Sequence, residues 1–494
     1  MSFHRDQNGF VFSLDAAFAI LVVMIVMTGV ARVAGPNLVY EQHGLLRLER
    51  YANDAIRVLD ELGALDNVAR DVEYGENASA ENTVRTWLRK ILPADVQFRF
   101  VFGDNLDNLL TVYPTSASGW SSAFAAAEGV TTGVRMATYW DGTSWSSYTI
   151  DNGTATIQAG QYTSIALDQS GAPHISYSRY NTLNGDDNLN YTRWTGFDWA
   201  IFVIQSTNDI GNYSSLALDN RGYAHVSYFN DSSDDLRRAF WNGNNWTLEN
   251  VDTSGSVGQY TSIALDNNGY ARISYYYATN GDLKYARWTG AAWSTETVDS
   301  TNNVGQYTSI ALDENWNPHI SYYDSTNADL KYARWTGSAW DIQTVDPSAN
   351  DVGKYSSIEL NDNQQPCISY YDDTADDLKY ARWTGSAWSI QTVDSDGIVG
   401  SYTSLDLDTN NNPHISYYDS GGGNLKYAWF NGSSWRRVTV DATDDVGRYS
   451  SLALVARGYP YISYYDATNG DLKYARSVWE YKSFILNIWR GSAP

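Results

Sequence analysis

The residues best suited to chemistry in this 494-residue sequence are histidines that recur at one position of a repeat. Four of the six histidines share that position: His174, His225, His319 and His414. Histidine is a frequent zinc ligand, so a metal centre is the first chemistry to consider. In the other repeats this position, which we call the histidine column, is occupied by Arg272, Cys367 and Tyr461. Because a repeat spreads one column around a ring, its members lie too far apart to share an ion, and we expect no metal site and no Cys–His nucleophile.

A second candidate is a Tyr–Asp pair at the end of a repeated β-rich run. The pairs are Tyr323 and Asp324, Tyr371 and Asp372, Tyr418 and Asp419, and Tyr465 and Asp466. Aromatic rings beside carboxylate oxygens suit sugar binding, through stacking and hydrogen bonds to hydroxyl groups. Oxygen-rich loops can also hold Ca²⁺. Aspartate equally opens tight turns by bonding its own backbone. The sequence leaves turn formation, ligand binding and structural calcium open, and we expect no other cofactor.

Catalysis in a repeat protein normally needs a cluster of residues that breaks the repeat. The arginines Arg287, Arg334 and Arg382 instead recur at equivalent positions. The segment 140–145, Trp-Asp-Gly-Thr-Ser-Trp, resembles the Asp-box turn of sialidase-type propellers, and that turn is structural in its own family. Finding no symmetry-breaking cluster, we predict that the chain is not an enzyme.

The repeat itself predicts the fold. A leading tyrosine recurs at Tyr162, Tyr213, Tyr260, Tyr307, Tyr355, Tyr402 and Tyr449, in steps of 47 to 51 residues. Each unit contains four β-rich runs, for example 308–312, 319–323, 330–335 and 340–345. Four short antiparallel strands per unit of this length are typical of a propeller blade. We predict a mainly β, seven-bladed β-propeller over residues 133–494.

The two ends of the repeat array are offset. Residues 134–150 correspond to the third and fourth strands of a repeat unit, and no first and second strands precede them. The last unit has only a degenerate fourth strand around 479–486. This predicts that the ring closes by pairing N-terminal strands with the C-terminal unit, which removes open sheet edges. An eighth, partial blade stays an alternative.

Ahead of the repeats, an apolar segment predicts a long hydrophobic helix at 10–35, in which Asp15 is the only acid. About 20 such residues cross a bilayer core. An amphipathic helix and a small α+β domain are expected at 36–113, followed by a Ser-, Ala- and Gly-rich linker at 114–132.

The polar leader at 1–9, which ends at Gly9 directly before the apolar segment, resembles the class III signal peptide of archaeal type IV pilins. The resemblance implies cleavage between Gly9 and Phe10. It also implies filament assembly in which Asp15 lies near the Phe10 amine of a neighbouring subunit. An uncleaved membrane anchor and a removed secretory signal are the alternatives.

The formal net charge of −24 argues against nucleic-acid binding, because an acidic surface repels phosphate backbones. An exported chain would offer N-glycosylation triplets at Asn77, Asn152, Asn190, Asn212, Asn230, Asn245 and Asn431.

Together these patterns predict an extracellular, cell-surface structural or adhesive protein. It would be a subunit or tip of a type IV pilus-like filament that leaves the membrane, self-assembles through N-terminal helices and displays a propeller that binds surfaces or glycans. The alternative is a membrane-anchored or secreted glycan-active enzyme of the sialidase or glycosidase type. A close pair of carboxyl groups in unequal environments at the propeller axis would favour that alternative.

Overall fold

The computed structural model describes residues 51–59, 65, 68, 77–92, 96–104, 107–112, 131–139, 144–206, 210–455, 458–477 and 480–490. The chain divides into two compact units, residues 1–139 with 480–494, and residues 140–479. The predicted leader at 1–9 and apolar helix at 10–35 lie outside the described residues. Among the helices that are described, none has the length and apolar character needed to span a membrane.

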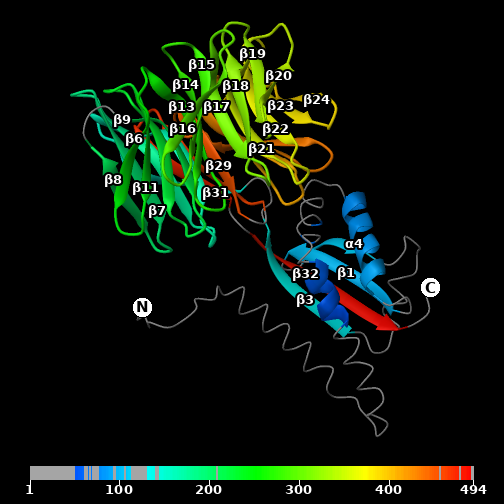
Figure 1. Ribbon diagram of the computed structural model, residues 1–494. Helices are drawn as coiled ribbons and strands as arrows, with labels where there is room; N and C mark the ends of the chain where they lie inside the picture. Colours follow the sequence, from blue (N-terminus) through cyan, green and yellow to red (C-terminus); the bar gives the residue numbers. More distant parts are fainter. Residues whose placement is uncertain are drawn as a thin grey trace, which may run out of the picture. The chain divides into compact units, whose positions relative to one another are not determined.

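The first unit is a four-stranded antiparallel sheet packed with helices (Figure 1). The strand order is β2 (Asp107–Val112), β1 (Val96–Asp104), β32 (Glu480–Arg490) and β3 (Thr131–Tyr139). In α4 (Asn77–Ile91), the apolar residues Ala80, Val84 and Leu88 recur every fourth position and are buried, as expected of an amphipathic helix. They share a core with Phe98 and Phe100 of β1 and with the helical segment 51–59.

The domain boundaries differ from those expected from the sequence. Residues 131–139 and 480–490 pair with each other in the sheet of the first unit, although we assigned 133–139 and 480–490 to the propeller and 131–132 to the linker. The second unit is therefore inserted between β3 and β32. The expected hairpin at 134–150 is split, because its first half pairs with β32 and its second half with a blade. An alternating strand pattern indicates a strand but does not say which distant strand completes the sheet.

The second unit is a seven-bladed β-propeller, as predicted. Each blade is a four-stranded antiparallel sheet. The innermost strands are β5 (Ile157–Leu167), β9 (Ile210–Leu218), β13 (Val257–Leu265), β17 (Val304–Leu312), β21 (Val352–Leu360), β25 (Val399–Leu407) and β29 (Val446–Leu454). The second strands are β6 (Pro173–Asn181), β10 (Ala224–Asn230), β14 (Ala271–Tyr277), β18 (Pro318–Asp324), β22 (Pro366–Asp372), β26 (Pro413–Asp419) and β30 (Pro460–Asp466).

The outer strands complete the blades. The third strands are β7 (Asp186–Trp194), β11 (Asp235–Trp241), β15 (Asp282–Trp288), β19 (Asp329–Trp335), β23 (Asp377–Trp383), β27 (Asn424–Phe430) and β31 (Asp471–Ser477). The outermost strands are β8 (Trp199–Gln205), β12 (Trp246–Asp252), β16 (Trp293–Asp299), β20 (Trp340–Asp346), β24 (Trp388–Asp394), β28 (Trp435–Asp441) and β4 (Trp145–Asp151).

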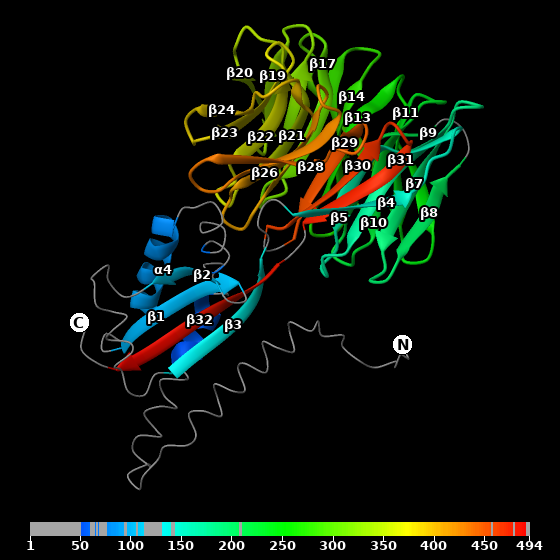
Figure 2. The ribbon, with the colours of Figure 1, turned by 180° about the vertical axis from the view of Figure 1, so that it is seen from behind.

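The ring closes in the blade that contains both ends of the repeat array. β4, from the start of the array, pairs with β31 at its end, so that Tyr148 lies opposite Tyr474 (Figure 2). The innermost strands β29 and β5 also contact each other, as neighbouring innermost strands do elsewhere in the ring. The predicted closure is confirmed, and the strands left over belong to the first unit rather than to an eighth blade.

A Gly-x-Tyr bulge in each innermost strand sets the distance between blades. In β21, Gly353 has φ +110°, and a Cβ there would lie 2.7 Å from Cα of Leu330 in the preceding blade. Two residues later, Tyr355 has φ +56°, a left-handed conformation that interrupts the regular alternation of side chains along the strand. Only glycine fits the first position, because the two backbones touch.

Candidate functional site at the propeller axis

Seven tyrosines form a closed ring around the axis. They are the leading tyrosines of the repeats: Tyr162, Tyr213, Tyr260, Tyr307, Tyr355, Tyr402 and Tyr449. Neighbouring ring centroids lie 4.5–4.8 Å apart, and the Tyr162–Tyr449 distance of 4.6 Å completes the circle. Burial raises the pKa of Tyr307 well above its usual range, and its neighbours Tyr355 and Tyr260 raise it further. With the Ser and Thr residues that follow, the ring lines a cavity of about 190 Å³.

Hydroxyl groups tie each innermost strand to the neighbouring blades. Thr308 donates a buried hydrogen bond to Ser274 of the preceding blade (2.8 Å). The next residue in the same strand, Ser309, accepts a hydrogen bond from the backbone N–H of Ile358 in the following blade (3.2 Å). Equivalent contacts recur around the ring, so the wall of the axial channel is rigidly positioned.

Two carboxyl groups break the symmetry of this wall. The position four residues after each ring tyrosine is alanine in five blades: Ala166, Ala217, Ala264, Ala311 and Ala453. In the two remaining blades it is Glu359 on β21 and Asp406 on β25. These strands are adjacent in the ring. The two acids therefore occupy equivalent positions on neighbouring innermost strands.

The two carboxyl groups have unequal environments. Burial raises the pKa of Glu359 to about 8, and the nearby Asp406 adds to the effect. Burial also raises the pKa of Asp406, but only to about 6. The difference follows from hydrogen bonding, because Asp406 accepts from the backbone N–H groups of Leu407 (2.7 Å) and Leu454 (2.8 Å), which stabilise its charged form.

A cavity of about 530 Å³ lies beside Glu359 at the end of the channel where the first and second strands of each blade connect. Its walls are innermost-strand residues, and its rim includes Glu314, Trp316 and Gln364 from those connections. Burial raises the pKa of both carboxyl groups, and the two backbone N–H groups that Asp406 accepts from favour its ionised form relative to that of Glu359. Such a pair can donate one proton and accept another, which is the requirement for acid–base catalysis.

The Tyr–Asp pairs singled out in the sequence are buried rather than displayed. Tyr323, Tyr371, Tyr418 and Tyr465 are each 4–6% exposed. The Tyr323 hydroxyl donates to Asp351 (2.7 Å), and its ring packs edge-on against Tyr307 of the axial ring. Tyr371 and Tyr418 donate to Asp376 and Asp445. These tyrosines therefore support the axial ring.

The aspartates of the same pairs shape the turns that follow them. Asp324 accepts hydrogen bonds from the backbone of Thr326 and Asn327, and Asp466 bonds its own turn in the same way. Asp372 accepts hydrogen bonds from the backbone N–H groups of Thr374 and Ala375, and Asp419 accepts one from the backbone N–H of Gly422. Turn formation accounts for these contacts. In the described parts of the chain, no three His, Cys, Asp or Glu side chains gather as metal ligands would.

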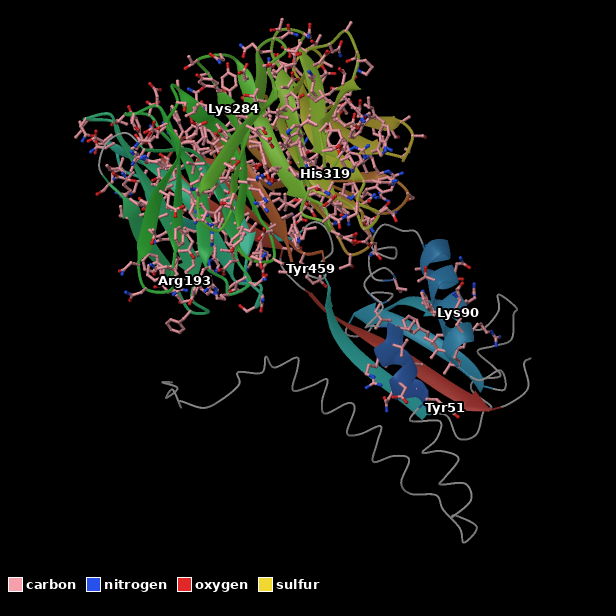
Figure 3. The ribbon with its side chains drawn as sticks, viewed as in Figure 1. Tyr51, Lys90, Arg193, Lys284, His319 and Tyr459 are labelled. Atoms are coloured by element: carbon pink, nitrogen blue, oxygen red, sulfur yellow. The ribbon has the colours of Figure 1, made fainter. Side chains whose placement is uncertain are left out.

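Three of the four column histidines bond a tyrosine of their own blade, whereas the Nδ1 of His225 has no hydrogen-bond partner among the residues that the structure describes. His319, labelled in Figure 3, bonds the hydroxyl of Tyr332 on the neighbouring strand. His174 and His414 bond Tyr191 and Tyr427 in the same way. Burial lowers the pKa of His319 to about 4, so its imidazole is neutral at physiological pH.

Two of the predicted glycosylation sites are buried in the folded protein. Asn190 is 2% exposed and Asn230 is 1% exposed, which excludes a glycan on either side chain of the native propeller. Asn152 and Asn245 are exposed, Asn212 and Asn431 are half-buried, and Asn77 begins α4. The predicted cleavage and assembly residues Gly9, Phe10 and Asp15 lie outside the described residues.

Comparison with known proteins bears on the fold. No protein-family profile matches the sequence, and no curated protein sequence matches it either. A solved polysaccharide lyase, titled PL25-ulvan lyase, is 13% identical over 67% of this chain and 95% of its own, with a TM-score of 0.51. The α-L-arabinanase of Penicillium chrysogenum is 12% identical over 68% of this chain and 98% of its own, with a TM-score of 0.44. The shared feature is the propeller fold.

These observations contradict the prediction that the chain is not an enzyme. The polysaccharide lyase that shares the fold at a TM-score of 0.51 is an enzyme, so the propeller fold gives no ground for excluding one. The premise of the prediction also fails, because Glu359 and Asp406 break the repeat at the axis. The sequence carries this signal as Ser-Ile-Glu-Leu and Ser-Leu-Asp-Leu, where the other repeats have Ser-Ile-Ala-Leu or Ser-Leu-Ala-Leu. We missed it because the other columns of these two repeats are regular.

Proposed function

We propose that the propeller is a glycan-active enzyme in which Glu359 and Asp406 form the acid–base pair. The observation that carries the proposal is the occurrence of these two acids on neighbouring innermost strands, in a column that is otherwise alanine, with Glu359 lining a cavity on the axis. An isolated buried acid is costly, and two neighbouring ones are costlier still, so their presence in an otherwise alanine column argues for function over stability.

The unequal environments assign the roles. Glu359, whose pKa is about 8, is the proton donor to the glycosidic oxygen of the leaving sugar. Asp406, whose pKa is about 6, is the carboxylate that removes a proton from the attacking water. The water oxygen bonds to the anomeric carbon as the C–O bond to the leaving sugar breaks, so one water molecule is consumed per bond cleaved. The cavity of about 530 Å³ has room for a small saccharide.

The test is hydrolysis of a panel of polysaccharides by the full-length chain, followed as released reducing ends. We expect Glu359→Ala and Asp406→Ala each to lower the rate at least about 100-fold. Both changes restore the residue found in five other blades, so they preserve the fold. Glu314→Gln alters an exposed acid at the cavity rim and serves as the matched control. Equal activity of the wild-type and alanine variants on a cleaved substrate would refute the proposal.

The pH dependence gives a second criterion. The rate should rise as Asp406 ionises near pH 6 and fall as Glu359 loses its proton near pH 8. In Glu359→Gln the fall on the alkaline side should disappear together with most of the activity. A rate that keeps increasing beyond pH 9 would exclude Glu359 as the proton donor.

We further propose that the apolar segment at 10–35 holds this enzyme at the outer cell surface. Its support is the resemblance of residues 1–35 to a pilin signal, and the acidic net charge suits an exposed protein. N-terminal sequencing of the mature protein distinguishes the possibilities. A start at Phe10 supports pilin-type processing and self-assembly, a retained Met1 supports a plain anchor, and a start beyond Ala34 refutes both.

A further inference from the structure

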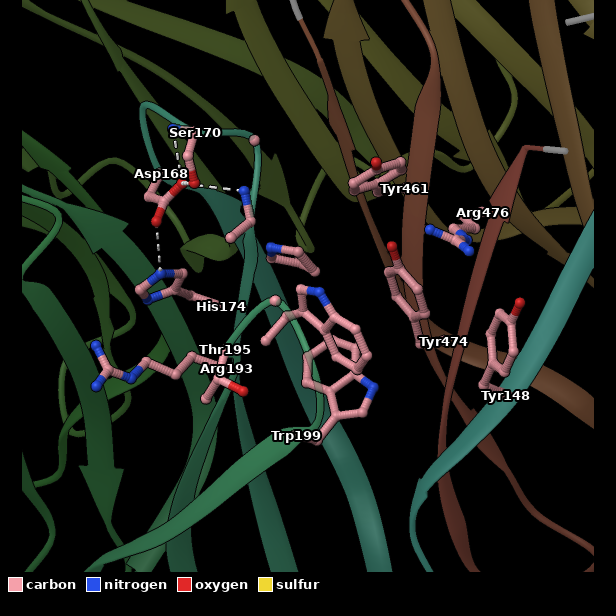
Figure 4. Close-up of a pocket in the computed structure, with 15 residues that line it drawn as sticks. Tyr148, Asp168, Ser170, His174, Arg193, Thr195, Trp199, Tyr461, Tyr474 and Arg476 are labelled. Carbon is pink, nitrogen blue, oxygen red and sulfur yellow. Dashed lines mark hydrogen bonds and ion pairs between the residues drawn. The ribbon is translucent and has the colours of Figure 1, made fainter. Parts of the chain in front are cut away.

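A second cavity lies at the seam where the propeller closes, between the last and the first blade. Its volume is about 660 Å³, and its lining comes from β6, β7 and β8 of the first blade and from β30, β31 and β4 of the closing blade (Figure 4). We call it the seam groove. It is separate from the axial cavity, since the two have no lining residue in common.

The groove is wider than its counterparts because the closing blade departs from the repeat. The third strand of most blades ends in tryptophan, such as Trp335, whereas β31 ends in Ser477. The equivalent groove between the blades that contain β19 and β23 measures about 530 Å³ and includes Trp335 in its wall. Loss of the indole side chain therefore opens the seam groove.

Aromatic side chains form one wall of the seam groove. Trp199 meets Tyr474 edge-to-face at 5.2 Å, and Tyr474 in turn contacts Tyr461 (5.8 Å) and stacks on Tyr148 (6.4 Å). Tyr148 is 44% exposed, so its ring is open to a ligand. In the repeat, Tyr148 replaces the polar Gln343 of the equivalent groove. Such a surface suits the apolar faces of sugar rings.

Two arginines give the groove a positive charge. Arg193 and Arg476 are exposed; Arg193 lies on the side of His174, and Arg476 lies between Tyr474 and Tyr148, with its guanidinium carbon 5.8 Å from the centre of the Tyr148 ring (Figure 4). Among the described residues, no carboxylate forms an ion pair with either arginine. Asp168, the acid in the lining, is engaged by its own turn and by His174 (3.6 Å). In the equivalent groove, by contrast, Arg334 is paired with Asp341 (3.0 Å).

We propose that the seam groove binds an anionic oligosaccharide, with its sugar rings against Tyr148 and Trp199 and its acidic groups on Arg193 and Arg476. A guanidinium that has no carboxylate partner within the protein can bind a ligand carboxylate or sulfate through parallel N–H···O bonds. A cationic groove on a chain of net charge −24 is selective, because the rest of the surface repels such a ligand. This site holds a glycan chain and is independent of the chemistry proposed for Glu359.

The test is calorimetric titration of the full-length chain with tetragalacturonate and with its methyl ester, which has the same sugar rings without the charge. We expect the acid to bind at least 10-fold more tightly than the ester, and the difference to shrink as salt is raised. A sulfated carrageenan tetrasaccharide tests whether the groove binds sulfate groups in place of carboxylates. Equal binding of acid and ester, or no binding of either anionic probe, would overturn the proposal.

Matched variants locate the site. Arg193→Gln and Arg476→Gln should each weaken binding of the better anionic probe at least 10-fold, and Tyr148→Ala should weaken binding of both acid and ester. Arg334→Gln changes the equivalent, already paired arginine and should leave affinity unchanged. A similar loss in Arg334→Gln would show that binding is nonspecific and would overturn the proposal. Because the readout is binding, absence of hydrolysis affects only the proposed function.

Discussion

The Ser451 hydroxyl on the last innermost strand accepts a hydrogen bond from the backbone N–H of Ile165 on the first, at 3.1 Å and across 286 residues of sequence. The same contact joins Ser262 to Ile310 between two internal blades, at 3.2 Å. The closing seam therefore uses the same hydrogen bond as the other blade boundaries. This identity of contacts leads to the first prediction.

Ser451→Ala should lower the free energy of unfolding by about 1–2 kcal/mol, because it leaves the N–H of Ile165 without an acceptor. Ser262→Ala should cost the same amount. Urea unfolding of the two variants and the wild type measures both values. If the ring were open in solution, Ser451→Ala would have no effect while Ser262→Ala would still destabilise.

Gly353→Ala should be more destabilising than Gly337→Ala. Both glycines have positive φ, so alanine costs about 1 kcal/mol at either position. At Gly337 no other atom lies within 4 Å of the added Cβ, whereas at Gly353 the Cβ would meet the Leu330 backbone at 2.7 Å. We expect that clash to add about 2 kcal/mol. Thermal unfolding of the two variants gives the comparison, and equal losses would show that blade spacing adjusts freely.

A buried cluster of charged groups at Asp394 should contribute to the loss of unfolding free energy at acidic pH. Asp394 accepts hydrogen bonds from Tyr417 (2.7 Å), Lys426 (2.5 Å) and Arg437 (2.5 Å). Burial alone would raise the pKa of Asp394, but the hydrogen bonds from Lys426 and Tyr417 hold it below the usual value. A lowered pKa means that the stabilisation exists above the unfolded-state pKa and is lost as the pH falls through the folded-state pKa.

Asp394→Asn should therefore cost about 3 kcal/mol at pH 7, since Lys426 loses its buried counter-charge. The cost should shrink as the pH falls below the ordinary aspartate range. Asp252, Asp299, Asp346 and Asp441 have the same lowered pKa in their blades, so the wild type should still unfold in acid. Asp396→Asn, at an exposed neighbour of Arg437, is the control and should be neutral. Denaturant unfolding between pH 2 and pH 7 checks these expectations.

Glu359→Ala should stabilise the propeller at alkaline pH. The folded-state pKa of Glu359 is raised to about 8 from an ordinary value of 4.5, so folding favours the protonated form. Its contribution to stability is therefore greatest below pH 4.5 and is lost as the pH rises to about 8. At pH 9 the alanine variant should gain up to about 5 kcal/mol over the wild type, and near pH 4.5 little or nothing.

Melting temperatures of Glu359→Ala and wild type across this pH range measure the effect, with the exposed Glu314→Ala as control. A variant that is both more stable and inactive would show that Glu359 is kept at the expense of stability, as is common at functional sites. A pH-independent difference would mean that the carboxyl group is hydrated and has an ordinary pKa.

The fold of the larger unit could be predicted from its repeats. Strand alternation, the Gly-x-Tyr bulge and the step of about 47 residues are local patterns that recur seven times, and local patterns can be read without knowing distant partners. The offset ends of the array likewise predicted that N-terminal strands would pair with the C-terminal unit, and the structure shows that the pairing strand is β4.

Which residues come into contact could be seen only in the folded chain. It moved residues 131–139 and 480–490 into the first unit, and it buried the Tyr–Asp pairs that looked suited to binding sugars. It also brought Glu359 and Asp406, 47 residues apart, onto neighbouring strands at the axis, and Arg193 and Arg476 onto one groove. Burial, pKa and ligand access depend on neighbours supplied by other blades, and the order of residues along one strand does not specify those neighbours.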